Sequence, residues 1–286
     1  MSKIMRCDLH THTNYSFDSN VTMMQYAQEA IKRGIDVVCF TDHIDCNVHY
    51  NTFDGFLFED RKAEFLRLKE QFRGQVELLL GFEIGEPHLH PEIMQAIYAC
   101  KPDMIIGSIH FPADYEQANK HYTSREYAQL YNRYVRKMVE HGGFDVLGHM
   151  DYPKKYHAQS VPSQEKHDGY TEDFDYICQT LRLCVEKGIV PEINTSSLRN
   201  GVADTMPSLK SIQYYANCGG KYVTINSDSH NINDLGYGYE QTYANLPKEL
   251  QTCYFVDRQL KIAKTVDLLI HIVPLQHRHI ISHDCK

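Results

Sequence analysis

Short apolar runs alternate with longer amphipathic stretches along most of this chain. The runs are rich in Val, Ile or Leu, a composition typical of parallel strands that are buried on both faces. The strands predicted in this way are Ile4–Leu9, Val37–Thr41, Val76–Leu80, Met104–Ser108, Val146–Gly148, Ile189–Asn194 and Tyr222–Asn226.

The amphipathic stretches between these runs have the spacing of helices with one buried face. The predicted helices are Met23–Lys32, Glu59–Phe72, Tyr127–His141, Phe174–Lys187 and Ser208–Asn217. A glycine follows four of them, at the position where a left-handed residue commonly ends a helix. These glycines are Gly34, Gly142, Gly188 and Gly219. The alternation predicts an α/β fold with a parallel sheet and crossover helices.

No polar edge strand is evident, so we expect the parallel sheet to close as a TIM-like barrel. The chain has 286 residues, which is enough for one large core. We therefore predict a single barrel domain over 1–265. From Val266 onward the chain is apolar and then rich in histidine, which favours a peripheral helix and a loose tail over 266–286.

Residues that bind metals recur where the predicted strands end. His10 and His12 follow the first strand two positions apart, so both rings point to one face of an extended chain, which Asp8 shares. Later strand ends carry the same residue types: Asp42 and His43, Glu83, His110, His149, Glu192, and Asp228 with His230. A buried group of this kind is costly without a cation, so the pattern predicts a metal centre at the carboxyl ends of the strands.

The ligand types restrict the choice of metal. Imidazole and carboxylate without thiolate suit zinc, iron, manganese or cobalt in a catalytic site. Four-coordinate catalytic zinc needs only three protein ligands plus water, and this chain offers many more. We therefore expect two or three divalent ions, with a carboxylate such as Glu83 bridging two of them.

These motifs resemble those of the polymerase and histidinol phosphatase (PHP) family over about residues 4–232. The resemblance implies a distorted seven-stranded (β/α) barrel with a three-ion centre. It implies that one ion binds His10, His12, Glu83 and Asp228, a second Glu83, His110 and His149, and a third Asp18, His43 and His230. Asp8 and Asp42 are then expected to orient the ligand histidines.

Within the family, the chain is similar to the histidinol-phosphate phosphatase branch. The similar segments are 81–87, 145–151 and 192–196, although Ser197 stands where the branch usually has glycine. The resemblance implies hydrolysis of L-histidinol phosphate to L-histidinol and phosphate, with a metal-bridging hydroxide as the attacking group.

A phosphomonoester dianion also needs support away from the metals. The predicted substrate-binding residues are Lys154, Lys155, Arg199, Asn194, Ser196 and Arg125. The branch often carries an arginine near Lys154 or Lys155, so the chain departs from its pattern there. The leaving-group acid remains open between a metal-bound water, Asp42 and His157.

Composition bears on the partners of the protein. The net charge of -8 and the pI of about 6.1 lack the basic footprint of a duplex-binding protein, so we expect a small phosphomonoester and no nucleic acid. A phosphodiesterase or exonuclease of the same family, acting on nucleotides or nucleic-acid ends, is the alternative. A non-enzymatic metal-binding or polymerase-associated module is disfavoured because every ligand position is filled.

Location is predicted from what the sequence lacks. The nine cysteines form no C-x-x-C pair, and no stretch approaches the roughly 20 apolar residues of a membrane span. The first residues lack the apolar run of a signal peptide. We therefore expect a cytoplasmic protein without a membrane partner. No sequence feature specifies an oligomeric state.

Overall fold

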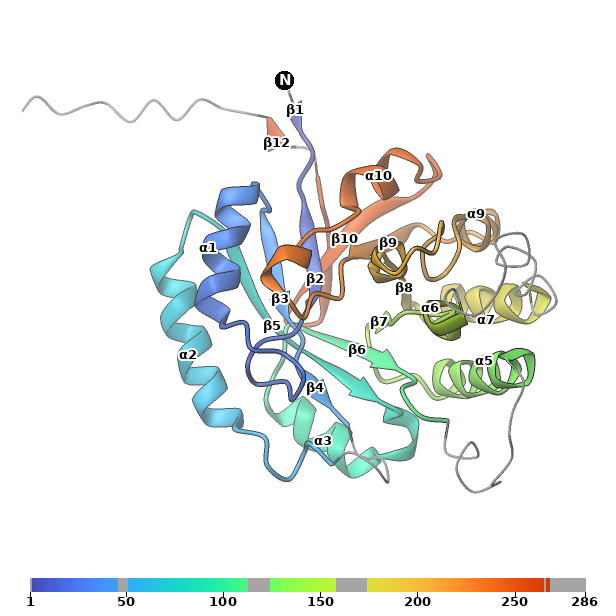
Figure 1. Ribbon diagram of the computed structural model, residues 1–286, viewed down its shortest axis with the longest axis horizontal. Coiled ribbons are helices and arrows are strands. Elements are labelled where there is room, and N and C mark those ends of the chain that lie inside the picture. The colour runs from blue at the N-terminus through green and yellow to red at the C-terminus, as the bar shows by residue number, and fades with distance from the viewer. Residues whose placement is uncertain (1, 46–50, 113–123, 158–173, 265, 268–286) are drawn as a thin grey trace, which may run out of the picture.

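Seven parallel strands form the framework of the protein (Figure 1). The computed structural model describes residues 2–45, 51–112, 124–157, 174–264 and 266–267. Each of the seven strands pairs with the next one along the chain. They are β2 (Cys7–Thr11), β3 (Val37–Phe40), β5 (Glu77–Gly85), β6 (Met104–Ser108), β7 (Val146–Leu147), β8 (Val190–Asn194) and β9 (Tyr222–Asn226). This order is the one that the alternation of strands and helices predicts.

The last strand returns to the first only at the carboxyl ends. Thr11 forms an isolated parallel bridge with Ser229, beyond the end of β9. The amide of His12 donates to the Ser229 carbonyl over 2.8 Å, and the Ser229 amide donates to the His10 carbonyl over 3.1 Å. The register between β2 and β3 also shifts between Asp8 and Thr11. The fold is therefore a distorted (β/α)7 barrel, closed where the predicted metal ligands lie.

Helices cover the outer face of the strands, with α1 and α2 on one side and α5, α7 and α9 on the other (Figure 1). The five predicted helices are confirmed as α1 (Met23–Arg33), α2 (Phe58–Gln71), α5 (Ser124–His141), α7 (Phe174–Lys187) and α9 (Leu209–Asn217). All four predicted capping glycines have positive φ, from 66° at Gly34 to 95° at Gly219. Only glycine adopts this conformation at little cost, which explains why the helices end there.

Helix α1 illustrates how the sequence determines the packing. Its N-cap Thr22 accepts a hydrogen bond from the amide of Gln25, and the Gln25 side chain accepts one from the Thr22 amide. This capping box satisfies two donors that a helix start leaves unpaired. Met23, Tyr26, Ala27 and Ala30 recur on one face of α1 and are buried. The helix therefore packs on β3 with the face that the periodicity predicts.

Short elements fill the connections between the main strands and helices. They are β4 (His43–Ile44), η1 (Pro87–Leu89), α3 (Pro91–Ala99), α6 (Pro153–His157), α8 (Ser196–Arg199), η3 (Ile232–Asp234) and α10 (Tyr239–Ala244). Strand β4 continues the line of β3 and pairs with β5, so that His43 lies opposite Glu83. None of these elements was predicted. All except the nine-residue α3 are shorter than a periodic pattern can reveal.

A hairpin follows the seventh parallel strand. Its strands are β10 (Gln251–Val256), parallel to β9, and β11 (Gln259–Ile262), antiparallel to β10. The turn residues Asp257 and Arg258 have φ of 49° and 61°, as a two-residue hairpin turn requires. The hairpin was not predicted because its turn lacks an Asn-Gly or Asp-Gly signal.

The predicted C-terminal helix is wrong at its first two residues. Val266–Asp267 form strand β12, which pairs with β1 (Ser2–Lys3). Backbone pairing with the N-terminal segment determines the local structure there, and the sequence pattern does not reveal it. The rest of that prediction, over 268–286, lies outside the described residues.

In the described part of the chain, no helix combines the length and the apolar character that crossing a membrane requires.

Candidate metal centre

Glu83 lies at the centre of the predicted ligands. It projects from β5, which β4 and β6 flank, and its side chain is 1% exposed. Its Oε1 lies 2.8 Å from His149 Nε2 and 3.2 Å from His110 Nε2. Its Oε2 lies 3.1 Å from His43 Nδ1, 3.2 Å from His10 Nε2 and 3.5 Å from His12 Nε2. Five imidazole rings thus surround one carboxylate.

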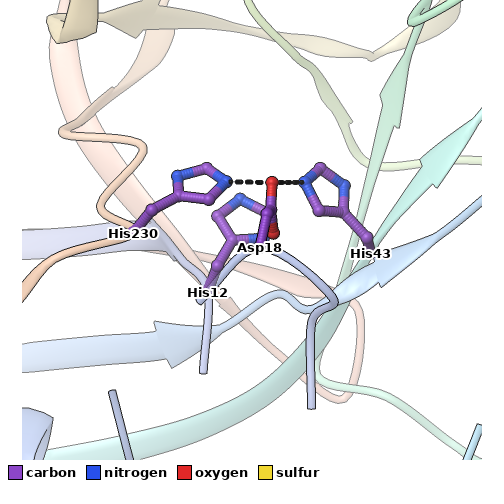
Figure 2. Close-up of side chains that lie close together, drawn as sticks. All are labelled: His12, Asp18, His43 and His230. Carbon is purple, nitrogen blue, oxygen red and sulfur yellow. Dashed lines mark ion pairs between the residues drawn. The ribbon is translucent and has the colours of Figure 1, made fainter. Parts of the chain in front are cut away.

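A second group gathers around Asp18 (Figure 2). Asp18 follows β2 in a loop, and its Oδ2 lies 3.1 Å from His230 Nε2 and 3.5 Å from His43 Nε2. The rings of His12 and His230 stack with their centroids 4.0 Å apart. Ligand atoms of these four residues all lie within 4.8 Å of one another. The loop position of Asp18 is therefore compatible with the predicted third ligand set.

The structure brings all nine predicted ligands together, but the compact groups differ from the predicted sets. The group around Asp18 also contains His12, which the predicted third set lacks, and two further groups include Glu83. His10, His12 and Glu83 form one compact group, and Asp228 Oδ1 is 3.4 Å from His12 Nε2. The other compact group joins His43, Glu83 and His110, whereas the predicted set has His149. His43 belongs to two groups because its two ring nitrogens face different residues, Nδ1 toward Glu83 and Nε2 toward Asp18. A neutral imidazole has one free lone pair, so it would bind an ion through only one of these nitrogens.

Several buried atoms at this point have no hydrogen-bond partner among the described residues. They are His10 Nε2, His12 Nε2, His43 Nδ1 and Glu83 Oε2. Each such atom costs roughly 1–3 kcal/mol when it is buried without a partner. The four atoms face one another, and a cation placed among them would satisfy them together. The donor set therefore fits divalent metal ions of the kind that imidazole and carboxylate bind.

The pKa shifts within the cluster differ in direction. Burial alone would raise the pKa of Glu83, but His10, His110 and His43 hold it well below its ordinary value. Burial lowers the pKa of His12, and the neighbouring His230 and His43 lower it further. An ionised carboxylate and a neutral imidazole are the forms that bind a metal. Burial opposes protonation of His10, His43 and His110, but the neighbouring carboxylates, Glu83 among them, raise the pKa of each ring above its ordinary value, so metal binding there would displace protons.

Two carboxylates that the sequence analysis did not assign orient ligand histidines. Glu192 Oε1 accepts from His10 Nδ1 over 2.7 Å, and its Oε2 accepts from the His149 amide over 2.7 Å. Asp45 Oδ1 accepts from His110 Nδ1 over 2.6 Å. Such bonds fix the ring so that Nε2 faces the metal position. Glu192 had a detectable signal, an acidic residue at a predicted strand end, but Asp45 lies in a loop and had none.

Asp8 does not orient the histidine rings as predicted. Its carboxylate accepts from the amides of Ser227 and Gly236, over 3.0 and 2.7 Å. It therefore holds the segment after β9 in place, on which Asp228 and His230 lie. The prediction failed because donors from a segment more than 200 positions along the chain occupy the Asp8 carboxylate, which the sequence pattern around Asp8 does not reveal.

Asp42 is not placed to act as the leaving-group acid. Its side chain is fully buried, with Oδ2 2.6 Å from the guanidinium Nε of Arg61. Its Oδ1 accepts from the amide of Thr13 over 2.6 Å. Both carboxylate oxygens are thus occupied by donors of the protein, and Asp42 is not among the described residues that line the cavity, so the structure does not place it as the leaving-group acid. The side chain of His157, the other candidate, lies outside the described part of the structure.

The side chains of Lys154 and Lys155, both predicted to bind substrate, point in different directions. Lys155 lines the cavity above the metal-type residues, with Nζ 3.7 Å from Asp228 Oδ2. Lys154 instead donates to Asp204 over 3.2 Å and to the Thr205 carbonyl over 3.0 Å. The structure therefore contradicts a substrate contact for Lys154, because neighbouring residues of helix α6 point to different sides.

The two arginines predicted to bind substrate, Arg199 and Arg125, also differ in position. Arg199 lines the cavity, and its guanidinium donates to the carbonyls of Ser227 and Asp228 over 2.6 and 3.0 Å. Arg125 is exposed on α5 and is not among the described residues that line the cavity. The structure therefore does not place Arg125 at the site.

Asn194 and Ser196 are buried beneath the cavity floor. Ser196 Oγ donates to Asp228 Oδ2 over 3.3 Å, and Asn194 Nδ2 lies 3.4 Å from the same oxygen. Neither residue is among the described lining residues. They hold Asp228, so the predicted contact with substrate is corrected to a contact with a predicted metal ligand.

The cavity has a volume of about 590 Å³. Asp18, His43, Glu83, His110, His149, Asp228 and His230 contribute to its floor, and the side walls include the aromatic residues Phe17, Phe111, Tyr127 and Tyr152. The volume suits a small molecule with polar and apolar parts.

Comparison with known proteins agrees with this geometry. The model of the PHP domain family matches residues 8–196, well over half of the chain. A relative from Clostridium acetobutylicum, named a probable histidinol-phosphatase, is 30% identical over 90% of this chain and 99% of its own length. The histidinol-phosphatase of Lactococcus lactis is 28% identical over 79% of this chain and 84% of its own length.

A solved structure has a similar fold. The crystal structure of histidinol phosphate phosphatase from Lactococcus lactis, complexed with zinc, L-histidinol and phosphate, superposes with a TM-score of 0.78 at 22% identity. The match covers 90% of this chain and 98% of that one. The family match, the full-length relative and the superposed barrel lead to one conclusion: the chain belongs to the PHP domain family.

Proposed function

We propose that this protein is a metal-dependent phosphatase that hydrolyses L-histidinol phosphate to L-histidinol and phosphate. The observation that carries the proposal is the buried group of unpartnered imidazole and carboxylate atoms at the floor of a small cavity. The histidinol-phosphatase relatives, which align over most of this chain, support the choice of substrate.

The proposed centre contains two or three divalent ions, of zinc, manganese or iron. The residues proposed to hold them are His10, His12, Asp18, His43, Glu83, His110, His149, Asp228 and His230. When bound, such ions supply Lewis acidity that activates water near neutral pH and offsets the charge of a phosphate group. Glu83 is proposed to bridge, because each of its two oxygens faces different histidines.

Two cations of the chain are proposed to bind the phosphate. Lys155 and Arg199 are the lysine and the arginine among the described lining residues of the cavity. Arg199 has five N–H groups. It directs two nitrogens at backbone carbonyls and its Nε at Asp234, 3.5 Å away, which leaves N–H groups for phosphate oxygens. The two carbonyl contacts fix the guanidinium before substrate arrives, which reduces the entropy lost on binding.

The aromatic walls are proposed to contact the organic part of the substrate. The ring of Tyr152 lies 4.6 Å from that of His149, and the ring of Phe17 lies 5.5 Å from that of His43. Both rings therefore border the floor where the phosphate would sit. The proposed location is the cytoplasm, on the cysteine pattern described above.

A phosphate-release assay tests the substrate. Purified protein with its metal content measured would be offered L-histidinol phosphate, other small phosphomonoesters and a 5′-phosphorylated oligonucleotide. We expect L-histidinol phosphate to give the highest kcat/KM. Steady hydrolysis of the oligonucleotide with L-histidinol phosphate left intact would favour the exonuclease alternative, and no hydrolysis of any phosphoester would favour a non-enzymatic role.

A variant links this activity to the cluster. His230→Ala removes a ring that contacts Asp18 but is itself 29% exposed, so the fold should be retained. We expect activity to fall by more than the ~100-fold that loss of an outer partner of a metal ligand can cause. Near-normal turnover in this variant would remove His230 from the site.

A further inference from the structure

A buried arginine connects the outer layer of the barrel to the metal-type residues. Arg61 projects from α2 and is 1% exposed. Its Nη2 donates to the carbonyls of Phe40 and Gly81, each over 2.9 Å, and its Nε donates to Asp42 Oδ2 over 2.6 Å. Arg61 thus ties together β3, β5 and the carboxylate that directly follows β3.

The Asp42 carboxylate, held by Arg61, in turn accepts a hydrogen bond from Ser16. An ionised carboxylate can only accept hydrogen bonds. Asp42 Oδ1 accepts from the amide and hydroxyl of Thr13, over 2.6 and 2.9 Å, and from Ser16 Oγ over 3.1 Å. The single hydroxyl proton of Ser16 must therefore point at Asp42.

Ser16 then determines which nitrogen of His12 carries the proton. With its own proton donated, Ser16 Oγ can only accept from its other neighbours. These are the amide of His43, over 3.1 Å, and Nδ1 of His12, over 3.2 Å. His12 must consequently carry its proton on Nδ1. Its Nε2 is left with a free lone pair that faces Glu83 Oε2 at 3.5 Å and Asp228 Oδ1 at 3.4 Å.

We infer that Arg61, Asp42 and Ser16 form a positioning relay that fixes His12 in the tautomer able to bind a metal. This inference rests on the proposed metal centre. Two other ligand histidines obtain the same tautomer directly from a carboxylate, His10 from Glu192 and His110 from Asp45. At His12 the Ser16 hydroxyl lies between Nδ1 of the ring and the carboxylate of Asp42, so the carboxylate acts through the serine.

Ser16→Ala is the sharpest test because it removes one oxygen and leaves the buried ion pair intact. We expect the affinity of the centre for zinc, measured by competition with a chromogenic chelator, to fall about 10- to 100-fold, as for other outer partners of metal ligands. Ser211→Ala is the matched control, since Ser211 is also buried and its hydroxyl contacts Ser208, the N-cap of α9, among the residues that the structure describes. It should leave zinc affinity unchanged.

The tautomer itself can be observed in the metal-free protein. Long-range ¹H–¹⁵N spectra of the histidine rings should show His12 protonated on Nδ1 in the wild type and a mixture of tautomers in Ser16→Ala. A wild-type His12 protonated on Nε2 would overturn the relay. So would unchanged zinc affinity in Ser16→Ala.

Arg61→Lys tests the start of the relay. Lysine keeps the charge but cannot donate in the planar geometry that reaches Asp42 and two carbonyls together. We expect a smaller fall in zinc affinity than in Ser16→Ala, with the His12 tautomer still mainly on Nδ1. A wild-type protein that bound no zinc would reject the proposed metal centre. If the wild type, Ser16→Ala and Arg61→Lys all bound zinc with equal affinity, the relay would be rejected and the proposed metal centre would stand.

Discussion

The carboxylates at the amino ends of the barrel strands differ from Glu83 at the carboxyl ends in how their oxygens are satisfied. At the amino ends of the strands, Asp145 accepts from the Ile105 amide over 2.9 Å and from the Arg258 guanidinium over 2.9–3.1 Å. Asp103 accepts from the amides of Leu80 and Asp257. At the carboxyl ends, Glu83 Oε2 has no donor among the described residues.

This difference separates structural carboxylates from ligand carboxylates. Protein donors satisfy the acids at the amino ends, so those acids join loops to strands and need nothing else. At the carboxyl ends, Asp8, Asp42, Asp45 and Glu192 also have protein donors. Glu83 Oε2 and the imidazole nitrogens that face it do not, and a cation placed among them would satisfy them together. The hydrogen-bond partners of a buried carboxylate therefore indicate its role better than its burial does.

The largest effect is expected for Glu83→Gln, which keeps the shape of the side chain and removes its charge. Without the negative charge, the five surrounding histidines lose their shared anionic partner, and metal binding should weaken severely. We expect phosphate release to fall by more than the ~100-fold typical of a lost outer partner. Turnover near the wild-type value would contradict the central role of Glu83.

A smaller effect is expected for Lys155→Met. A hydrogen bond to a charged group contributes about 1.5–3 kcal/mol, so kcat/KM for L-histidinol phosphate should fall roughly 10- to 100-fold. Lys154→Met is the matched control within the same helix. It should reduce the free energy of unfolding and leave kcat/KM near the wild-type value. The reverse result would show that the lysine roles are exchanged.

The smallest effect on activity is expected at the other end of the barrel. Asp145→Asn weakens the contact with Arg258 and should lower the free energy of unfolding by about 1–3 kcal/mol, measured by urea denaturation. Phosphate release at saturating substrate should not change, because no described contact connects Asp145 to the cavity. A loss of turnover without a loss of stability would contradict the division between the two ends.

The sequence was most informative where one local rule acts on each element. Parallel strands place their carboxyl ends at one edge, so His10, Glu83 and His149 could be grouped before the structure was known. Helix ends were also predictable, because Gly34 and Gly188 occupy positions that require positive φ.

Contacts between distant segments were not predictable from the sequence. The role of Asp42 depends on Arg61, which α2 brings to it from 19 positions along the chain. The difference between Lys154 and Lys155 depends on the phase of a five-residue helix, which is too short to show a periodic pattern. The role of Asp8 depends on the amides of Ser227 and Gly236, which lie more than 200 positions along the chain.

The most direct test of the central claim is the metal content of three proteins purified under identical conditions, measured by elemental analysis together with phosphate release from the same samples. Wild type and Asp145→Asn should each retain two or three divalent ions per chain and full activity. Glu83→Gln should retain fewer ions and almost no activity. Metal-free wild type that still hydrolyses L-histidinol phosphate, or equal metal content in all three proteins, would contradict the account.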